Sequence, residues 1–142
     1  MIFATAAAAS LLAASVNAVT AYSGGTMTGV IADDVTVGSG YSYIDISGAD
    51  IQGTLSFNGV DAGATISVAN TQVAGAGIVF MTALSSNRVT LTNVDATSTG
   101  HAVHMQQTLT ASTFTVTGGA YVATNVGFRF DGTDETSSVS LS

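Results

Sequence analysis

The sequence predicts an all-β chain wound into one parallel β-solenoid of about six coils, each of 22–28 residues. A short motif recurs along the chain, beginning at Ile44, Ile66, Val89, Phe114 and Val139, in steps of 22, 23, 25 and 25 residues. Each copy alternates apolar and small polar residues, which is typical of a strand with one buried face. No helical pattern lies between the copies, and strands that recur at one coil length indicate a solenoid.

Composition supports one globular domain over residues 1–142. Hydrophobic residues make up 46% of the chain and proline is absent, which suits long strand ladders. Charged residues are only 8%, against roughly 25% in an average domain. The net charge is −7 and there is no lysine, so we expect neither nucleic acid nor an anionic membrane surface as a partner. The chain has no cysteine, which excludes disulfides and thiolate metal sites.

Residues 1–22 have two interpretations. They carry no charge and are rich in alanine, like the apolar centre of a signal peptide, and Val16-Asn17-Ala18 is a passable cleavage site. No basic residue precedes the apolar stretch, which a signal peptide would normally have. Alternatively the segment is the first coil, with Phe3 aligned to Phe80 and Leu12 aligned to Val89.

A second strand is expected in each coil, upstream of the repeated motif. Residues 25–30 are assigned to this set, and residues 33–38 match the repeat least well. We therefore expect a loop or bulge at 33–38, in a second turn that is the longest of the six. The segments of this set lie at 1–3, 25–30, 53–57, 77–80, 100–103 and 127–130, and the turns start near 1, 25, 53, 77, 100 and 126.

Apolar residues at equal positions of successive coils should stack into inward columns, because no single turn can bury its own apolar face. The motif predicts two such columns. One contains Ile44, Ile66, Val89, Phe114 and Val139, and its neighbour contains Ile46, Val68, Leu91, Val116 and Leu141.

This coil spacing resembles the right-handed parallel β-helix of the pectin-lyase-like superfamily, most closely over Ile66 to Val116. In character the chain is closest to the repetitive, non-catalytic surface and adhesin members. Asp33-Asp34 resembles the paired aspartates of glycoside-hydrolysing members. The Asn-x-Asp and Arg-x-Lys elements that accompany that pair are missing, so we expect no enzyme, and a polysaccharide lyase or hydrolase is a distant alternative.

Few residues suggest a metal or cofactor site. His101 falls in an inward column with Leu55, Ile78 and Phe128, and is expected in the core or at a corner. His104 lies three residues further on and should point outward, so the two should not share a metal. Calcium is the one ion considered, at Asp131, Asp134 and Glu135, but their spacing matches no standard Ca²⁺ loop and no cofactor is expected.

The outward face of the repeated strand carries regular hydroxyl groups. Such rows are similar to the ice-binding faces of some antifreeze proteins, and could equally bind glycans or pack laterally against another solenoid. Threonine is also simply favoured in strands. The residues concerned are Thr65, Ser67, Thr90, Thr92, Thr113, Thr115, Thr117 and Ser140.

The chain shows no polar capping helix at either end. Val139 and Leu141 belong to a core strand, and Met1, Ile2 and Phe3 occupy a strand position on the first-coil interpretation. We therefore expect a structural subunit, extracellular or at the cell surface, that stacks head to tail into a homopolymeric filament or surface layer. The alternative is an adhesin-like or ice-binding module that uses the hydroxyl rows.

Overall fold

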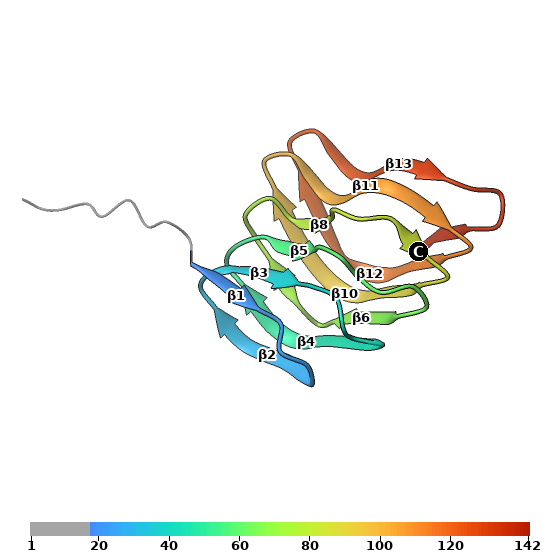
Figure 1. The fold of residues 1–142 in the computed structure, drawn as a ribbon. Helices are drawn as coiled ribbons and strands as arrows, with labels where there is room; N and C mark the ends of the chain where they lie inside the picture. The colour runs from blue at the N-terminus through green and yellow to red at the C-terminus, as the bar shows by residue number, and fades with distance from the viewer. Residues whose placement is uncertain (1–17) are drawn as a thin grey trace, which may run out of the picture.

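The computed structural model describes residues 18–142, which form a parallel β-solenoid of about five turns (Figure 1). These residues contain no helix, so the predicted all-β solenoid is confirmed. The sixth predicted turn relied on residues at the beginning of the chain. Most of that turn, including Phe3 and Leu12, lies outside the described residues, whereas residues 19–21 do form a strand.

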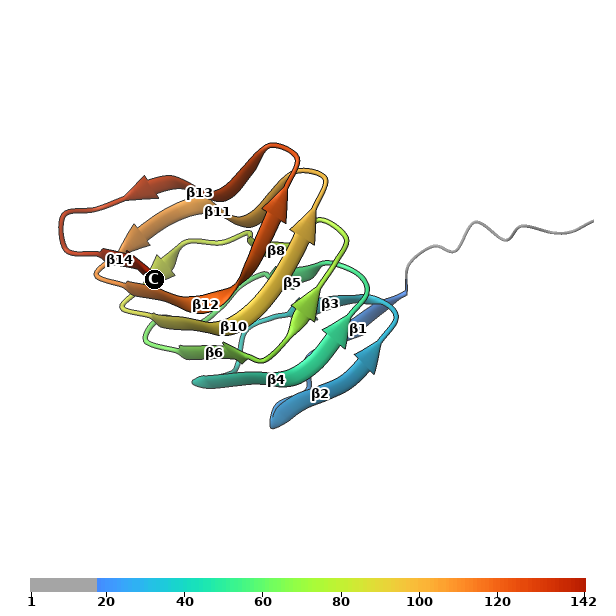
Figure 2. The same ribbon diagram turned by 180° about the vertical axis from the view of Figure 1, so that it is seen from behind.

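Two parallel sheets make up the walls of the solenoid, and each successive turn adds to both of them (Figure 2). The first sheet contains β1 (Val19–Ala21), β3 (Asp34–Val37), β5 (Leu55–Phe57), β8 (Ile78–Phe80), β9 (Leu84–Ser85), β11 (His101–Thr110) and β13 (Val126–Thr133). The second sheet contains β2 (Thr26–Ile31), β4 (Tyr43–Ile51), β6 (Thr65–Ala69), β7 (Gln72–Val73), β10 (Arg88–Ser98), β12 (Thr113–Ala123) and β14 (Ser138–Leu141).

Both inward columns predicted from the repeated motif are present in the second sheet. The register pairs Ile44 with Ile66, Ile66 with Val89, and Phe114 with Val139. The column from Ile46 to Leu141 follows two residues further along each strand. Residues in the inner turns are buried, whereas Val139 and Leu141 are 40% and 52% exposed, because a terminal turn has a neighbour on one side only.

The first sheet contributes an aromatic column to the same core. Phe57 and Phe80 are register partners, and their rings stack nearly parallel with centroids 4.5 Å apart. Phe80 also meets Phe114 of the second sheet edge to face at 5.5 Å. Phe114 in turn meets Phe130 of the last turn at 5.1 Å. These contacts join the two walls through the middle of the solenoid.

The predicted alignment of residues 100–103 is wrong by two residues. Val103, not His101, is the register partner of both Ile78 and Phe128. His101 instead pairs with Val126 and is only partly buried. The alternation fails here because Ala102 and Val103 are both buried, directly after the corner that ends β10. Strict alternation along residues 100–103 therefore predicts the wrong face for His101.

The predicted loop at residues 33–38 is also wrong. Asp34–Val37 forms β3, in which Val35 and Val37 are fully buried against Leu55 and Phe57. Of residues 25–30, predicted for the same sheet, all but Gly25 lie instead in β2, which pairs with β4. The second turn is consequently one of the shorter turns, not the longest. A register shift does occur in it, but between Met27 and Gly29.

Two corners of the middle turns are closed by asparagine side chains. At one, Asn70 and Asn93 take positive φ angles of 48° and 50°, and the Asn93 amide donates to Asn70 Oδ1 at 3.4 Å. At the other, the buried Asn87 amide donates to the carbonyl oxygens of Asp61 and Ala64. Because asparagine tolerates the left-handed conformation and can satisfy buried backbone groups, it suits these positions.

We predict that Gly77→Ala destabilises the solenoid far more than Gly63→Ala. Both glycines have positive φ, 78° and 77°, so alanine at either position costs about 1 kcal/mol in backbone strain. A Cβ at Gly77 would additionally overlap the Ala102 carbonyl oxygen, whereas at Gly63 it would meet nothing within 4 Å. Overpacking of this kind adds about 1–3 kcal/mol. Urea unfolding measures the loss of free energy of unfolding in each variant. Equal losses in the two variants would contradict the close approach of Gly77 to the next turn.

Candidate functional site

The last turn presents an apolar edge. Among the described residues, β13 and β14 each end their sheet and pair on one side only. Val139 and Leu141 project inward at this edge and are substantially exposed, and Phe128 and Phe130 are partly buried beside them. We call these four residues the terminal face.

The opposite end presents the same columns. Met27 pairs with Ile46, so it begins the column that Leu141 ends. Ile31 pairs with Ile51, and this column ends at Tyr121. Met27 and Ile31 are both partly buried. The other residues predicted for this end, Met1, Ile2 and Phe3, lie outside the described part of the chain.

The predicted hydroxyl residues align in rows on the outer surface of the second sheet. The middle row runs through Ser67, Thr90, Thr115 and Ser140, which are successive register partners. On one side Arg88 separates Thr65 from Thr113, and on the other Thr92 pairs with Thr117. We call these eight residues the hydroxyl face. The middle row is interrupted at Asp45, whose carboxylate accepts a hydrogen bond from Thr26 at 2.8 Å.

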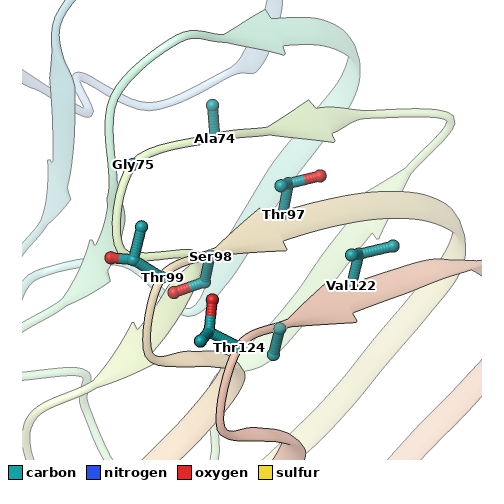
Figure 3. Close-up of a pocket in the computed structure, with 8 residues that line it drawn as sticks. Ala74, Gly75, Thr97, Ser98, Thr99, Val122 and Thr124 are labelled. Carbon is teal, nitrogen blue, oxygen red and sulfur yellow. The ribbon is translucent and has the colours of Figure 1, made fainter.

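A shallow groove that sequence reasoning missed lies at the corner between the two sheets. Its main hollow, of about 520 Å³, is lined by small and hydroxyl-bearing side chains from three turns (Figure 3). A second hollow of about 270 Å³ shares Ser98 and Thr99 with it and continues to His101 and His104. The groove follows the short turn at Ala74–Gly75, and no repeat motif marks it in the sequence. The main hollow is lined by Ala74, Gly75, Thr97, Ser98, Thr99, Val122, Ala123 and Thr124.

A polar cluster adjoins the second hollow. The His101 and His104 rings meet edge to face, with centroids 4.8 Å apart, so the prediction that they point to opposite faces is wrong. From β13, Asp131 contacts His104 Nε2 at 3.0 Å and accepts a hydrogen bond from Arg129 Nε at 2.6 Å. The hydrogen bond from Arg129, and after it that from His104, lowers the pKa of the Asp131 carboxyl. We call these four residues the His/Arg cluster.

The residues considered for calcium do not form a site. Within residues 18–142, no group of three or more His, Cys, Asp or Glu side chains is placed to hold a metal ion. The Asp134 carboxylate instead accepts hydrogen bonds from the Ser137 and Thr136 hydroxyls and from the Ala111 amide. These contacts, the Ser137 bond first, lower the pKa of Asp134. Asp134 thus closes the last corner.

The paired aspartates have local structural partners. Asp34 Oδ1 accepts a hydrogen bond from the Thr54 amide at 2.7 Å, which links two successive turns. Asp33 Oδ2 accepts one from the Thr20 hydroxyl at 3.4 Å. Both carboxylates therefore contribute to the connections between the first turns.

Comparisons with family models, with curated proteins and with solved structures found no match to this chain. The part of the chain that the structure describes also has no helix long and apolar enough to cross a membrane. Function must therefore be argued from the geometry of the terminal face, the hydroxyl face, the groove and the His/Arg cluster.

Tyr121 is a polar residue at the end of an apolar column. Its ring packs against Phe128 with centroids 4.5 Å apart, and its buried hydroxyl has no hydrogen-bond partner among the described residues. Burial, and secondly the charge of Asp95, raises the pKa of Tyr121 to about 12. The neutral form is therefore favoured in the folded state. The resulting stability is present below about pH 10 and is lost as the pH rises from about 10 towards 12.

We predict that Tyr121→Phe stabilises the chain at neutral pH by up to about 1 kcal/mol, because it removes an unsatisfied buried hydroxyl. The advantage should grow near about pH 11, since phenylalanine has no proton to lose. Urea midpoints of both proteins at the two pH values measure this. A variant that is less stable at neutral pH would indicate that the Tyr121 hydroxyl has a partner in solution.

Proposed function

We propose that this chain is a structural, extracellular β-solenoid subunit that stacks head to tail into a filament or surface layer. The observation that carries the proposal is the exposed terminal face, together with the same apolar columns at the other end of the solenoid. The occupant of the terminal face is the first turn of a second copy. Leu141 would then lie over Met27 of that copy, and Tyr121 over its Ile31.

Stacking in this register satisfies two needs at once. The free edges of β13 and β14 gain parallel strand partners from β1 and β2 of the next copy, and the half-exposed apolar residues become buried. Each buried large aliphatic side chain contributes about 1.5–3 kcal/mol at full burial. Because the two contacting surfaces differ, the contact is heterologous, and repeating it generates an open filament.

Sparse charge favours the same contact. β14 consists of Ser138, Val139, Ser140 and Leu141, with no charged residue that would lose water on stacking. Arg129 and Asp131 do lie on the edge strand β13, but their side chains are exposed and pair with each other on its outer side. The net charge of −7 on each copy opposes stacking, and physiological salt screens this repulsion.

A second candidate function rests on the hydroxyl face. Register pairing spaces its hydroxyl groups by about 4.8 Å from turn to turn and by about 7 Å along a strand. Such an array suits a binding module, either an adhesin-like module for glycans or an ice-binding surface. This function uses an outer wall of the solenoid and leaves the terminal face free, so the two candidates can be tested separately.

We predict that Val139→Asp abolishes polymers that the wild-type chain forms at neutral pH. A carboxylate on the terminal face would be buried without a partner, which costs several kcal/mol and outweighs the gain from pairing. Ser140→Asp is the matched control, because it adds the same charge to the same strand on its outer side. Electron microscopy should show wild-type and control filaments with an axial repeat near 29 Å, about six strand spacings, because each sheet stacks six strand positions per copy. Dispersed wild-type particles would contradict the proposal.

The hydroxyl face gives a separate prediction. If it binds ice, Thr90→Tyr or Thr115→Tyr should remove thermal hysteresis, because a bulky ring breaks the flat array. Thr97→Tyr, on the same long strand β10 but in the groove, should leave it unchanged. For a glycan-binding module, the same three variants are compared on a glycan array. Equal behaviour of all three would exclude the hydroxyl face as the binding surface.

A further inference from the structure

The His/Arg cluster holds most of the basic side chains of the protein. The chain has two arginines, two histidines and no lysine, against nine carboxylates. Both histidines and Arg129 lie in this one cluster, on the outer side of the last two turns of the first sheet. Arg88 is the only basic residue elsewhere, on the second sheet. The cluster is therefore the one place where this acidic chain gathers more than one basic side chain.

Within the cluster, the contact between Arg129 and His101 includes no carboxylate. Asp131 pairs with Arg129 Nε and with His104 Nε2. Arg129 Nη1 makes no hydrogen bond to the Asp131 carboxylate and lies 3.5 Å from His101 Nε2. Arginine can only donate, so the neutral His101 ring must accept at Nε2 and carry its proton on Nδ1. His101 Nδ1 is buried and has no partner among the described residues.

Protonation changes this contact. Imidazole side chains gain a proton at mildly acidic pH. His101 Nε2 would then become a donor that faces the donor Nη1 of Arg129, and two positive groups would stand in contact. Asp131 compensates only one of the positive charges of Arg129, His101 and His104. An anion that accepts hydrogen bonds from both Nη1 and Nε2 would relieve the repulsion and satisfy both donors.

We propose that His101 and Arg129 form a binding site for an oxyanion, such as a carboxylate, sulfate or phosphate group, which fills as the cluster is protonated. His104 is held by Asp131 and adds positive charge beside the site. The solute that carries the anionic group would lie in the adjoining hollow of about 270 Å³, where Thr99 and Gln106 offer uncharged polar groups and Ala76 and Val79 offer apolar contact.

The pH dependence follows from the groups that surround His101. From β11 it faces His104, and from β13 it faces Arg129, with Asp131 one step behind. The turn beneath contributes Val79, and the preceding corner contributes Ser98 and Thr99, none of which ionises between acidic and neutral pH. Protonating both histidines therefore changes the net charge of the cluster from about zero to about +2, which strengthens anion binding as the pH falls.

The test is an NMR titration of the ¹⁵N-labelled full chain with sodium sulfate, sodium phosphate and sodium acetate, at constant ionic strength. At about pH 5.5 we expect saturable shifts of the His101 imidazole and Arg129 guanidinium signals, with affinity about tenfold or more weaker at about pH 7.5. Preference for acetate would assign the site to carboxylate-bearing solutes, and preference for sulfate or phosphate to their esters. No saturable binding of any of the three anions at the lower pH would overturn the proposal.

Matched variants separate a specific site from general attraction. Arg129→Gln should abolish binding, whereas Arg88→Gln removes the same charge from the second sheet and should leave binding unchanged. His101→Gln keeps the Arg129–Asp131 pair, so it tests the site even if Arg129→Gln disturbs the last turn. Equal weakening by Arg88→Gln and Arg129→Gln would mean non-specific binding and would reject the site. Arg129 lies on β13 between Phe128 and Phe130 of the terminal face, so repeating the titration on the Val139→Asp chain separates anion binding from filament formation.

Discussion

The stacking of apolar columns from turn to turn is the interaction on which the rest of the structure depends. A single turn of about 25 residues cannot enclose its own core, so each turn is stable only when another lies against it. The inward side chains of the inner turns are buried, and the aromatic contacts from Phe57 through Phe80 and Phe114 to Phe130 extend this packing across both walls. The same requirement explains why the last turn exposes apolar residues, and it is the physical basis for proposing a second copy as its partner.

The corners determine where the solenoid departs from a uniform tube. Regular strands stack like residues on like, but the turns between them differ in length and composition. The turn at Ala74–Gly75 is shorter than the corresponding turns that follow it, and the groove lies along it. Asparagine and serine side chains close other corners through bonds to backbone groups. The irregular start of β11 has the same origin, since His101 follows a corner and its ring turns towards His104.

Sparse charge gives the few ionic groups more weight than they would have on an ordinary surface. Most carboxylates act locally, as Asp34 and Asp134 do when they accept backbone amides from neighbouring turns. The His/Arg cluster differs because it gathers positive groups that no second carboxylate balances. Its side chains lie on the outer wall of the first sheet, although Arg129 and Asp131 come from β13, the strand that also carries Phe128 and Phe130 of the terminal face. End-to-end assembly and anion binding would therefore use different surfaces of the same short solenoid.

The sequence by itself determined the fold class and the register of the second sheet from β4 to β14, because the motif from Ile44 to Leu141 alternates strictly and repeats at nearly constant steps. It also placed the hydroxyl rows, which follow from that register. It determined the first sheet only in part: Leu55 and Ile78 are register partners as predicted, whereas β3 was predicted as a loop or bulge and residues 100–103 were misaligned. Strands there are short and follow corners, so a period of two is too brief to fix which side faces inward. The groove and the meeting of His101, His104, Arg129 and Asp131 were decided only by the tertiary structure, since they join residues from different turns whose spacing depends on the corners between them.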